Sequence, residues 1–186
     1  MKENRLISFL IVIAIYAITI VLGIVIYNLL SFHYLLKLLI TDIICTTIVF
    51  AFSLLLKNAS CYDPYWSVAP VVIIISLLAS FGLNAPRILV AIAISIWGIR
   101  LTANWAYTFK GLNFEDWRYV MLREKTKKFY PLINFLGIHL FPTIVVYLCM
   151  IPAVSMFYME NNINALVIVL GERLSFSPAS SLVNIK

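Results

Sequence analysis

The sequence predicts an all-α protein: a polytopic transmembrane helical bundle with about five spans and one further helix in the cytosolic interface. Of its 186 residues, 63% are hydrophobic and only 12% are charged. Soluble domains have about 45–50% apolar and about 25% charged residues, so a globule of this composition could not hide its apolar surface from water. The apolar residues also occur in long runs, and this pattern, like the composition, indicates a membrane protein.

Five of these runs are long enough to cross the hydrocarbon core of a bilayer, which takes about 20 apolar residues in a helix. The first carries no charge and is too long for a cleaved signal peptide. Asp42 interrupts the second near one end, where we expect an interfacial residue, and Pro142 and Pro152 bend the fifth. The predicted spans are residues 6–30, 38–56, 65–83, 88–109 and 132–158.

The domain organisation is simple. We expect one transmembrane helical domain over residues 1–170 and an irregular C-terminal tail over residues 171–186. A sixth apolar run, residues 163–170, is too short to cross the bilayer. The tail differs in composition, since it has four serines and no amphipathic period.

Lysine and arginine are unevenly distributed among the loops, and this asymmetry predicts a cytosolic N-terminus. The basic group at residues 110–128 would then lie in the cytosol, and the opposite loops would carry only Lys37 and Arg87. Membrane lipids explain such basic segments beside apolar spans better than a nucleic-acid partner does. The three cysteines and two histidines lack metal-ligand spacing, so no metal site is expected.

The fourth span has a polar stripe, since Trp97, Arg100, Asn104 and Tyr107 share one face of a helix. A central arginine costs about 2.5–3.5 kcal/mol on insertion scales. Arg100 therefore either has a partner inside the bundle or a polar ligand, or it snorkels to the cytosolic headgroups.

The segment between the second and third spans is rich in hydrogen-bonding groups. Asp63 precedes Pro64, and the two residues could cap the third span. Alternatively, Asp63 is the counter-ion of Arg100 or Arg118, and we expect Asp63 and Arg100 to share one polar network at the cytosolic end. His139, in the bent fifth span, is expected to be a packed, hydrogen-bonded core residue.

Residues 113–123 have the pattern of an amphipathic helix. Asn113 is a plausible N-cap, and Phe114, Trp117 and Met121 recur on an apolar face. One interpretation is a helix that lies in the cytosolic interface. The other is a functional one, because the guanidinium groups of Arg118 and Arg123 suit phosphate or an anionic headgroup.

Three segments together resemble uncharacterised membrane proteins grouped with the steroid 5-alpha-reductases. That superfamily also includes sterol C=C reductases and, more distantly, isoprenylcysteine carboxyl methyltransferase. The resemblance covers roughly residues 40–155. The segments are Asn58-x-Ser60-x-x-Asp63-x-x-Trp66, Arg100-Leu-x-x-Asn104-Trp105 and Glu115-Asp116-Trp117-Arg118-Tyr119-x-x-x-Arg123.

The resemblance implies a membrane oxidoreductase that uses NADPH to reduce a C=C bond in a sterol-like or other lipid substrate. Hydride would reach the β-carbon of an enone, and polar groups would hold the enolate oxygen. The resemblance assigns no proton donor in this sequence. The residues it suggests for the cofactor pocket or the active-site wall are Asp63, Arg100, Asn104, Asp116, Arg118, Tyr119 and Arg123.

The sequence departs from that family after the fifth span. Members of the family continue with further helices and an Arg-x-Pro-Asn-Tyr-like segment that builds much of the cofactor site, and this sequence has no such segment. Either the chain is a fragment or frame-shifted product, or it has lost the activity, so we expect the 186 residues neither to reduce a substrate nor to hold NADPH tightly. Two other functions remain open: a non-catalytic bundle that binds a lipid or partner, and a methyltransferase relative.

Overall fold

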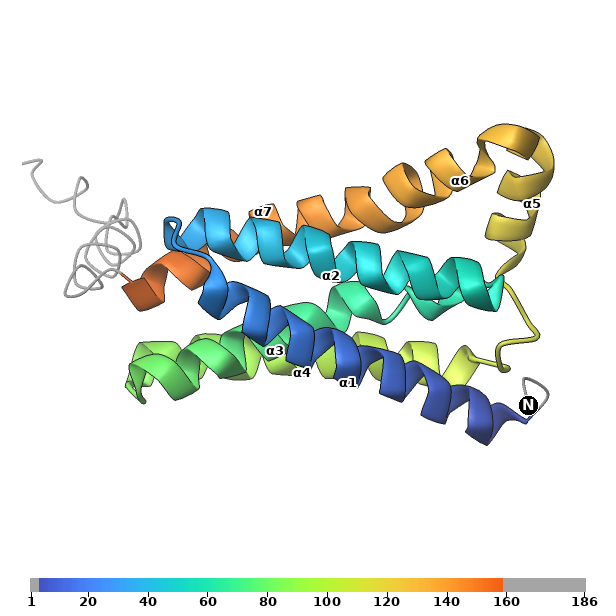
Figure 1. The fold of residues 1–186 in the computed structure, drawn as a ribbon. Coiled ribbons are helices and arrows are strands. Elements are labelled where there is room, and N and C mark those ends of the chain that lie inside the picture. The colour runs from blue at the N-terminus through green and yellow to red at the C-terminus, as the bar shows by residue number, and fades with distance from the viewer. Residues whose placement is uncertain (1–3, 159–186) are drawn as a thin grey trace, which may run out of the picture.

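The computed structural model describes residues 4–158, and within this part of the chain it is a bundle of long helices without strands (Figure 1). Five helical stretches are long and apolar enough to cross a membrane. The predicted fold class is confirmed. The expected tail and the short run at 163–170 lie outside the described residues.

The first two helices form an antiparallel pair. Helix α1 (Arg5–Leu29) begins at Asn4, whose side chain accepts a hydrogen bond from the N–H of Leu6, and α2 (Tyr34–Leu56) ends at Lys57 in the left-handed conformation. They pack closely at Gly23, because a Cβ there would lie 2.8 Å from Cys45 Sγ.

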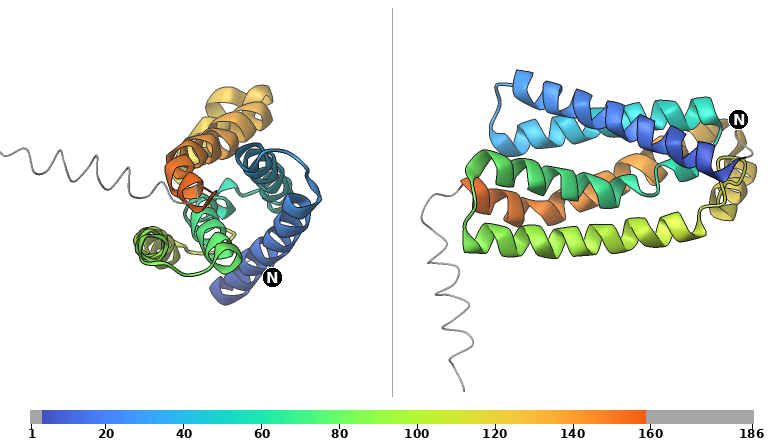
Figure 2. Two further views of the ribbon diagram at one scale, coloured as in Figure 1. Left: turned by 90° about the vertical axis from the view of Figure 1, so that its left-hand side faces the viewer. Right: turned by 90° about the horizontal axis from the view of Figure 1, so that it is seen from below.

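Helices α3 (Tyr65–Phe81) and α4 (Ala85–Thr108) form a second pair. Gly82, with a φ of +78°, ends α3, and Asn84 caps α4 by accepting from the N–H of Arg87. Helix α4 lies at the edge of the bundle (Figure 2), and its buried residues are Ala91 and Gly98.

The last span is built from three consecutive helical pieces: α6 (Tyr130–Ile133), a π-helix η3 (Asn134–Leu140) and α7 (Phe141–Tyr158). The π-helix ends two residues before Pro142, which lacks the N–H that an α-helix would use. The irregularity expected at Pro142 is thus found just before it.

Helix α5 (Trp117–Thr126) and the short helix η2 (Lys127–Phe129) join α4 to α6 across one end of the bundle, called the α5 end below (Figure 1). Asp116 caps α5, so the expectation that Asn113 is the N-cap is wrong. The helix begins later than expected because the segment before α5 is bound to the α2–α3 connection, as described below.

The connection from α2 to α3 is the least regular part of the core. It contains the short helix η1 (Ala59–Cys61), and it turns back from the α5 end into the bundle before α3 begins (Figure 1). Tyr65, the first residue of α3, bonds to Asp42. From residue 42 to the end of α2 the helix rises about 21 Å, so α3 begins deep inside the bundle.

A non-helical segment at this depth must satisfy its polar backbone groups within the protein. The N–H of Tyr62 bonds to the carbonyl of Ala59, and the N–H of Asp63 to that of Ser60. Tyr16 Oη, from α1, donates to the carbonyl of Cys61 over 2.8 Å. The irregular backbone is therefore tolerated because protein surrounds and satisfies it.

Candidate functional site

The α2–α3 connection and the segment after α4 are joined by one buried amide at the α5 end. Asn58 Nδ2 donates to the carbonyl oxygens of Leu112 (2.9 Å) and Phe114 (3.0 Å). Its Oδ1 accepts from the N–H of Ser60 over 2.9 Å. Since Asn58 is only 1% exposed, it satisfies three backbone groups that water reaches poorly.

Two further side chains reinforce this junction. Glu115 Oε1 accepts from the N–H of Ala59 and Ser60 Oγ accepts from the N–H of Asp116, each over 2.9 Å. Arg123 Nη2 lies 2.6 Å from Glu115 Oε2. The bonds run in both directions between the two segments, so each fixes the other.

Asp63 is bound by α5. The hydroxyl of Tyr119 donates to Asp63 Oδ1, and both side chains are half-buried. The side chain of Asp63 therefore holds α5 to the connection, and it does not cap α3. Five of the seven site residues suggested by the sequence come together at this end: Asp63, Asp116, Arg118, Tyr119 and Arg123.

Asp116 and Arg118 form a bidentate ion pair at the start of α5. Arg118 Nε and Nη2 donate to the two carboxylate oxygens over 2.9 and 2.8 Å. The hydrogen bonds from Arg118 hold the pKa of Asp116 below its usual value. Because Asp116 also accepts from the N–H of Arg118, this carboxylate orients the first turn of α5.

A pocket of about 330 Å³ lies at the junction. Carboxylates and aromatic rings line it together, beside Ser60, Thr108 and Lys110. Arg118 and Arg123 pair with two of its carboxylates and are themselves exposed. The lining carboxylates are Asp63, Glu115 and Asp116, and the lining rings are Trp105, Phe109, Phe114 and Trp117.

Arg100 and Asn104 lie elsewhere, on the exposed face of α4. Among the described residues Arg100 has no ion pair or hydrogen bond, and Asp63 binds Tyr119 instead. The expected Asp63–Arg100 network is therefore wrong. Of the alternatives for Arg100, the described residues offer no partner inside the bundle. Helical spacing correctly places Arg100 and Asn104 on one face, but it does not say whether that face meets the bundle or its surroundings.

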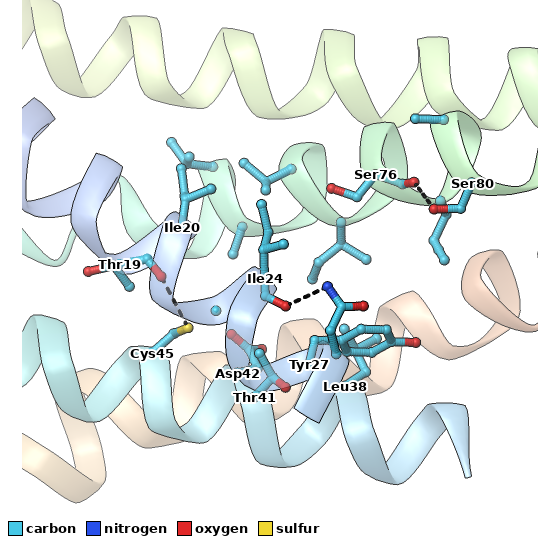
Figure 3. A pocket seen from close by; sticks show the side chains of 18 of the residues that line it. Thr19, Ile20, Ile24, Tyr27, Leu38, Thr41, Asp42, Cys45, Ser76 and Ser80 are labelled. Carbon is cyan, nitrogen blue, oxygen red and sulfur yellow. Dashed lines mark hydrogen bonds between the residues drawn. The ribbon is translucent and has the colours of Figure 1, made fainter. Parts of the chain in front are cut away.

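A second, larger cavity of about 430 Å³ lies between α1, α2 and α3 (Figure 3). Most of its wall is apolar, including Ile20, Ile24 and Leu38. Helix α1 packs mainly on α2 and makes little direct contact with α3, and this leaves the space between them. The cavity runs along α3 from Tyr65 to Phe81.

Asp42 and Tyr65 form one of the polar parts of the cavity lining. Tyr65 Oη donates to Asp42 Oδ1 over 2.8 Å, and both residues are buried. Thr41 lies beside Asp42 (Figure 3), and its Oγ1 is buried without a hydrogen-bond partner among the described residues. Asp42 is therefore a buried cavity residue about two turns inside α2, and the expectation that it is a helix-end residue is wrong.

The sequence reasoning did not select Asp42, Tyr65 or Tyr16 as site residues, although all three line the cavity. One signal was available, since a carboxylate within a membrane span is costly and usually functional. Asp42 lies only a few residues after the predicted start of the span, so the sequence alone indicates a residue of the helix end. Its partner Tyr65 depends on the inward turn of residues 57–64, which no local pattern predicts.

Comparison with known proteins gives one result. A model of the family described as "Protein of unknown function (DUF1295)" matches residues 49–174. This range includes the α2–α3 connection, the whole of the junction and Tyr65, whereas Asp42 precedes it. Searches among curated proteins and among solved structures find no match.

Proposed function

This chain belongs to the DUF1295 family, and we propose that it is a membrane oxidoreductase that reduces a C=C bond of a lipid substrate with NADPH. The observation that carries the proposal is the Asp42–Tyr65 pair in the lining of an apolar cavity within the spans. An apolar wall with few convergent polar groups is typical of a small-molecule site. A lipid with one reactive oxygen matches this distribution of polarity.

The chemistry of the pair supports reduction of an enone. With the Asp42 carboxyl protonated, it can donate to the Tyr65 oxygen while the phenol proton turns toward a substrate carbonyl oxygen. Such donors stabilise the negative charge that develops on an enolate oxygen, and they do so most effectively where water is excluded. Tyr65 would then touch the substrate directly, and Asp42 would orient and polarise it.

The α5 end offers groups that fit the implied cofactor. The guanidinium of Arg118 uses Nε and Nη2 on Asp116 and keeps Nη1 free, and Arg123 contacts Glu115 through Nη2. Both side chains are exposed, so N–H donors remain for phosphate oxygens. We propose that Arg118, Arg123 and Lys110 hold the phosphates and that Asp63 accepts from a ribose or amide group. NADPH supplies the hydride when it is bound.

The test uses membranes from cells that produce the protein, given NADPH deuterated at the transferred position. The sequence alone predicts weak NADPH binding, but the exposed arginines at the α5 end and the Asp42–Tyr65 pair favour an active site. We therefore expect deuterium to appear in a lipid of these membranes, and we expect Tyr65→Phe and Asp42→Asn to abolish the transfer. Tyr147→Phe is the matched control, because its hydroxyl bonds the carbonyl of Leu35 away from the cavity lining.

A parallel sample receives S-adenosylmethionine with a labelled methyl group. Methyl transfer to a lipid without deuterium transfer would replace the reductase with a methyltransferase. A lipid that is retained by the purified protein, with neither label incorporated, would indicate a non-catalytic binding protein.

A further inference from the structure

A row of buried polar side chains follows the last span from the α5 end into the bundle. Tyr130, Asn134, His139 and Thr143 are 8%, 3%, 0% and 2% exposed. His139 is packed and hydrogen-bonded, as expected from the sequence. The steps between the four residues are four, five and four positions, which is close to one helical turn each.

The five-residue step coincides with the π-helix. In an α-helix, residues five apart are turned about 140° from each other. The bonds of a π-helix run from i to i+5, and η3 covers the whole step from Asn134 to His139. His139 Nδ1 accordingly lies 3.1 Å from the carbonyl oxygen of Asn134. The π-helix thus keeps the two side chains in one row.

Besides the hydroxyl of Tyr130, two acceptors in this row have no hydrogen-bond partner among the described residues: Asn134 Oδ1 and His139 Nε2. Because a carbonyl can only accept, Nδ1 of the neutral ring carries the proton and Nε2 is a bare acceptor. A buried polar group without a partner costs about 1–3 kcal/mol. Buried water is the usual group that satisfies such atoms, and it can donate to both acceptors.

The row continues as hydroxyl groups to the membrane cavity. Thr143 Oγ1 lies 2.7 Å from Tyr62 Oη and 2.8 Å from Thr46 Oγ1. Thr46 is one turn from Asp42 on the same face of α2, and both side chains are buried. Tyr65 in turn donates to Asp42.

We propose that this row is a proton path, lined by bound water and hydroxyl groups, from the α5 end to the Asp42–Tyr65 pair. A ligand in the cavity would cover that pair on the cavity side, so a second route is needed to restore a proton given to the ligand. One proton enters from water at the α5 end, each bound water and each hydroxyl group passes on one proton and receives one, and no electrons move. Asn134 accepts from the water without relaying a proton. His139 is a positioning residue that orients water at Nε2. The use of the path rests on the proposed function, but its existence does not.

The test is nuclear magnetic resonance on the protein in lipid nanodiscs, with ¹⁵N-histidine and with tyrosine labelled with ¹³C at Cζ. The chain has only two histidines, so His33→Gln assigns the ring of His139. We expect magnetisation transfer from water to that ring. If the ring shows no water contact, the path is excluded.

The second measurement is the hydrogen–deuterium exchange rate of the Tyr65 hydroxyl, read from the isotope shift at Cζ and assigned with Tyr65→Phe. Thr143→Val should slow this exchange by about tenfold or more, because it breaks the chain of bonded groups. Thr143→Ser should restore it. Thr47→Val is the control, since the Thr47 hydroxyl bonds only within its own helix, to the carbonyl of Ile43.

Equal exchange rates in Thr143→Val and the control would overturn the path. Neither measurement involves NADPH or reduction. A chain that reduces no lipid could therefore still show the path, and an active reductase could still lack it.

Discussion

Asn58 satisfies three backbone groups with one side chain, two in the segment after α4 and one in its own turn. Asn58→Ala would leave these groups buried without partners, each at a cost of about 1–3 kcal/mol. We expect it to lower the free energy of unfolding by about 3 kcal/mol or more, measured by chemical denaturation in detergent. Asn113→Ala is the control, because Asn113 is exposed. Equal losses in the two variants would contradict this role.

The pairing of Asp63 can be measured with two double-mutant cycles. Asp63→Asn combined with Tyr119→Phe should show a coupling of about 1–2 kcal/mol, since a hydroxyl donates to a half-buried carboxylate. Asp63→Asn combined with Arg100→Gln should be additive. Unfolding free energies of the single and double variants supply both values. A larger coupling to Arg100 than to Tyr119 would mean that the observed pairing is wrong.

At the scale of helices, Gly98 sets the approach of α4 to α3. A Cβ at Gly98 would lie 2.4 Å from Val71 Cγ2 and 2.6 Å from the carbonyl oxygen of Ser67. The backbone oxygen cannot move aside as a side chain can, so Gly98→Ala should destabilise the pair by about 1–3 kcal/mol. The measurement is the unfolding midpoint in one detergent.

Gly137 is the matched control for this helix contact. It lies in the π-helix, and nothing is within 4 Å of a Cβ built there. Gly137→Ala should be neutral or slightly stabilising, because glycine costs about 0.5–1 kcal/mol in a helix. If both alanine variants unfold at the same midpoint, close packing at Gly98 does not hold α3 and α4 together.

For the whole molecule, the structure gathers most of the basic loop residues at the α5 end, whereas Lys37 and Arg87 lie at the other end. We predict that the α5 end faces the cytosol. A membrane-impermeant thiol reagent should label Lys125→Cys only from the cytosolic side and Leu83→Cys only from the opposite side. Cys149→Ser removes the exposed native thiol, and Cys45 and Cys61 are buried.

Permeabilised membranes are the control for this labelling, because both introduced cysteines should then react. Labelling of Lys125→Cys from the opposite side would reverse the orientation. It would also place the pocket that contains Asp63 on the side away from cytosolic NADPH, so the proposed function would fail with it.

The five spans, their order and the separation of basic from apolar segments can all be predicted from the sequence. These properties are local, since the length of an apolar run decides whether a helix can cross a bilayer. The residues of the junction come from two short segments, residues 58–63 and 115–123, so the members of each segment are neighbours already in the sequence.

Which helix faces meet could not be predicted from the sequence and is known from the tertiary structure. In the structure Arg100 is exposed and residues 57–64 turn into the bundle. Tyr65 bonds to Asp42, and Thr143 bonds to Thr46. Each of these outcomes depends on contacts between residues distant in sequence. Helical periodicity shows which residues share a face of a helix, but not which other helix that face contacts. In this chain the helices have apolar residues on every side, so the contacts depend on packing and on the partners of buried polar groups.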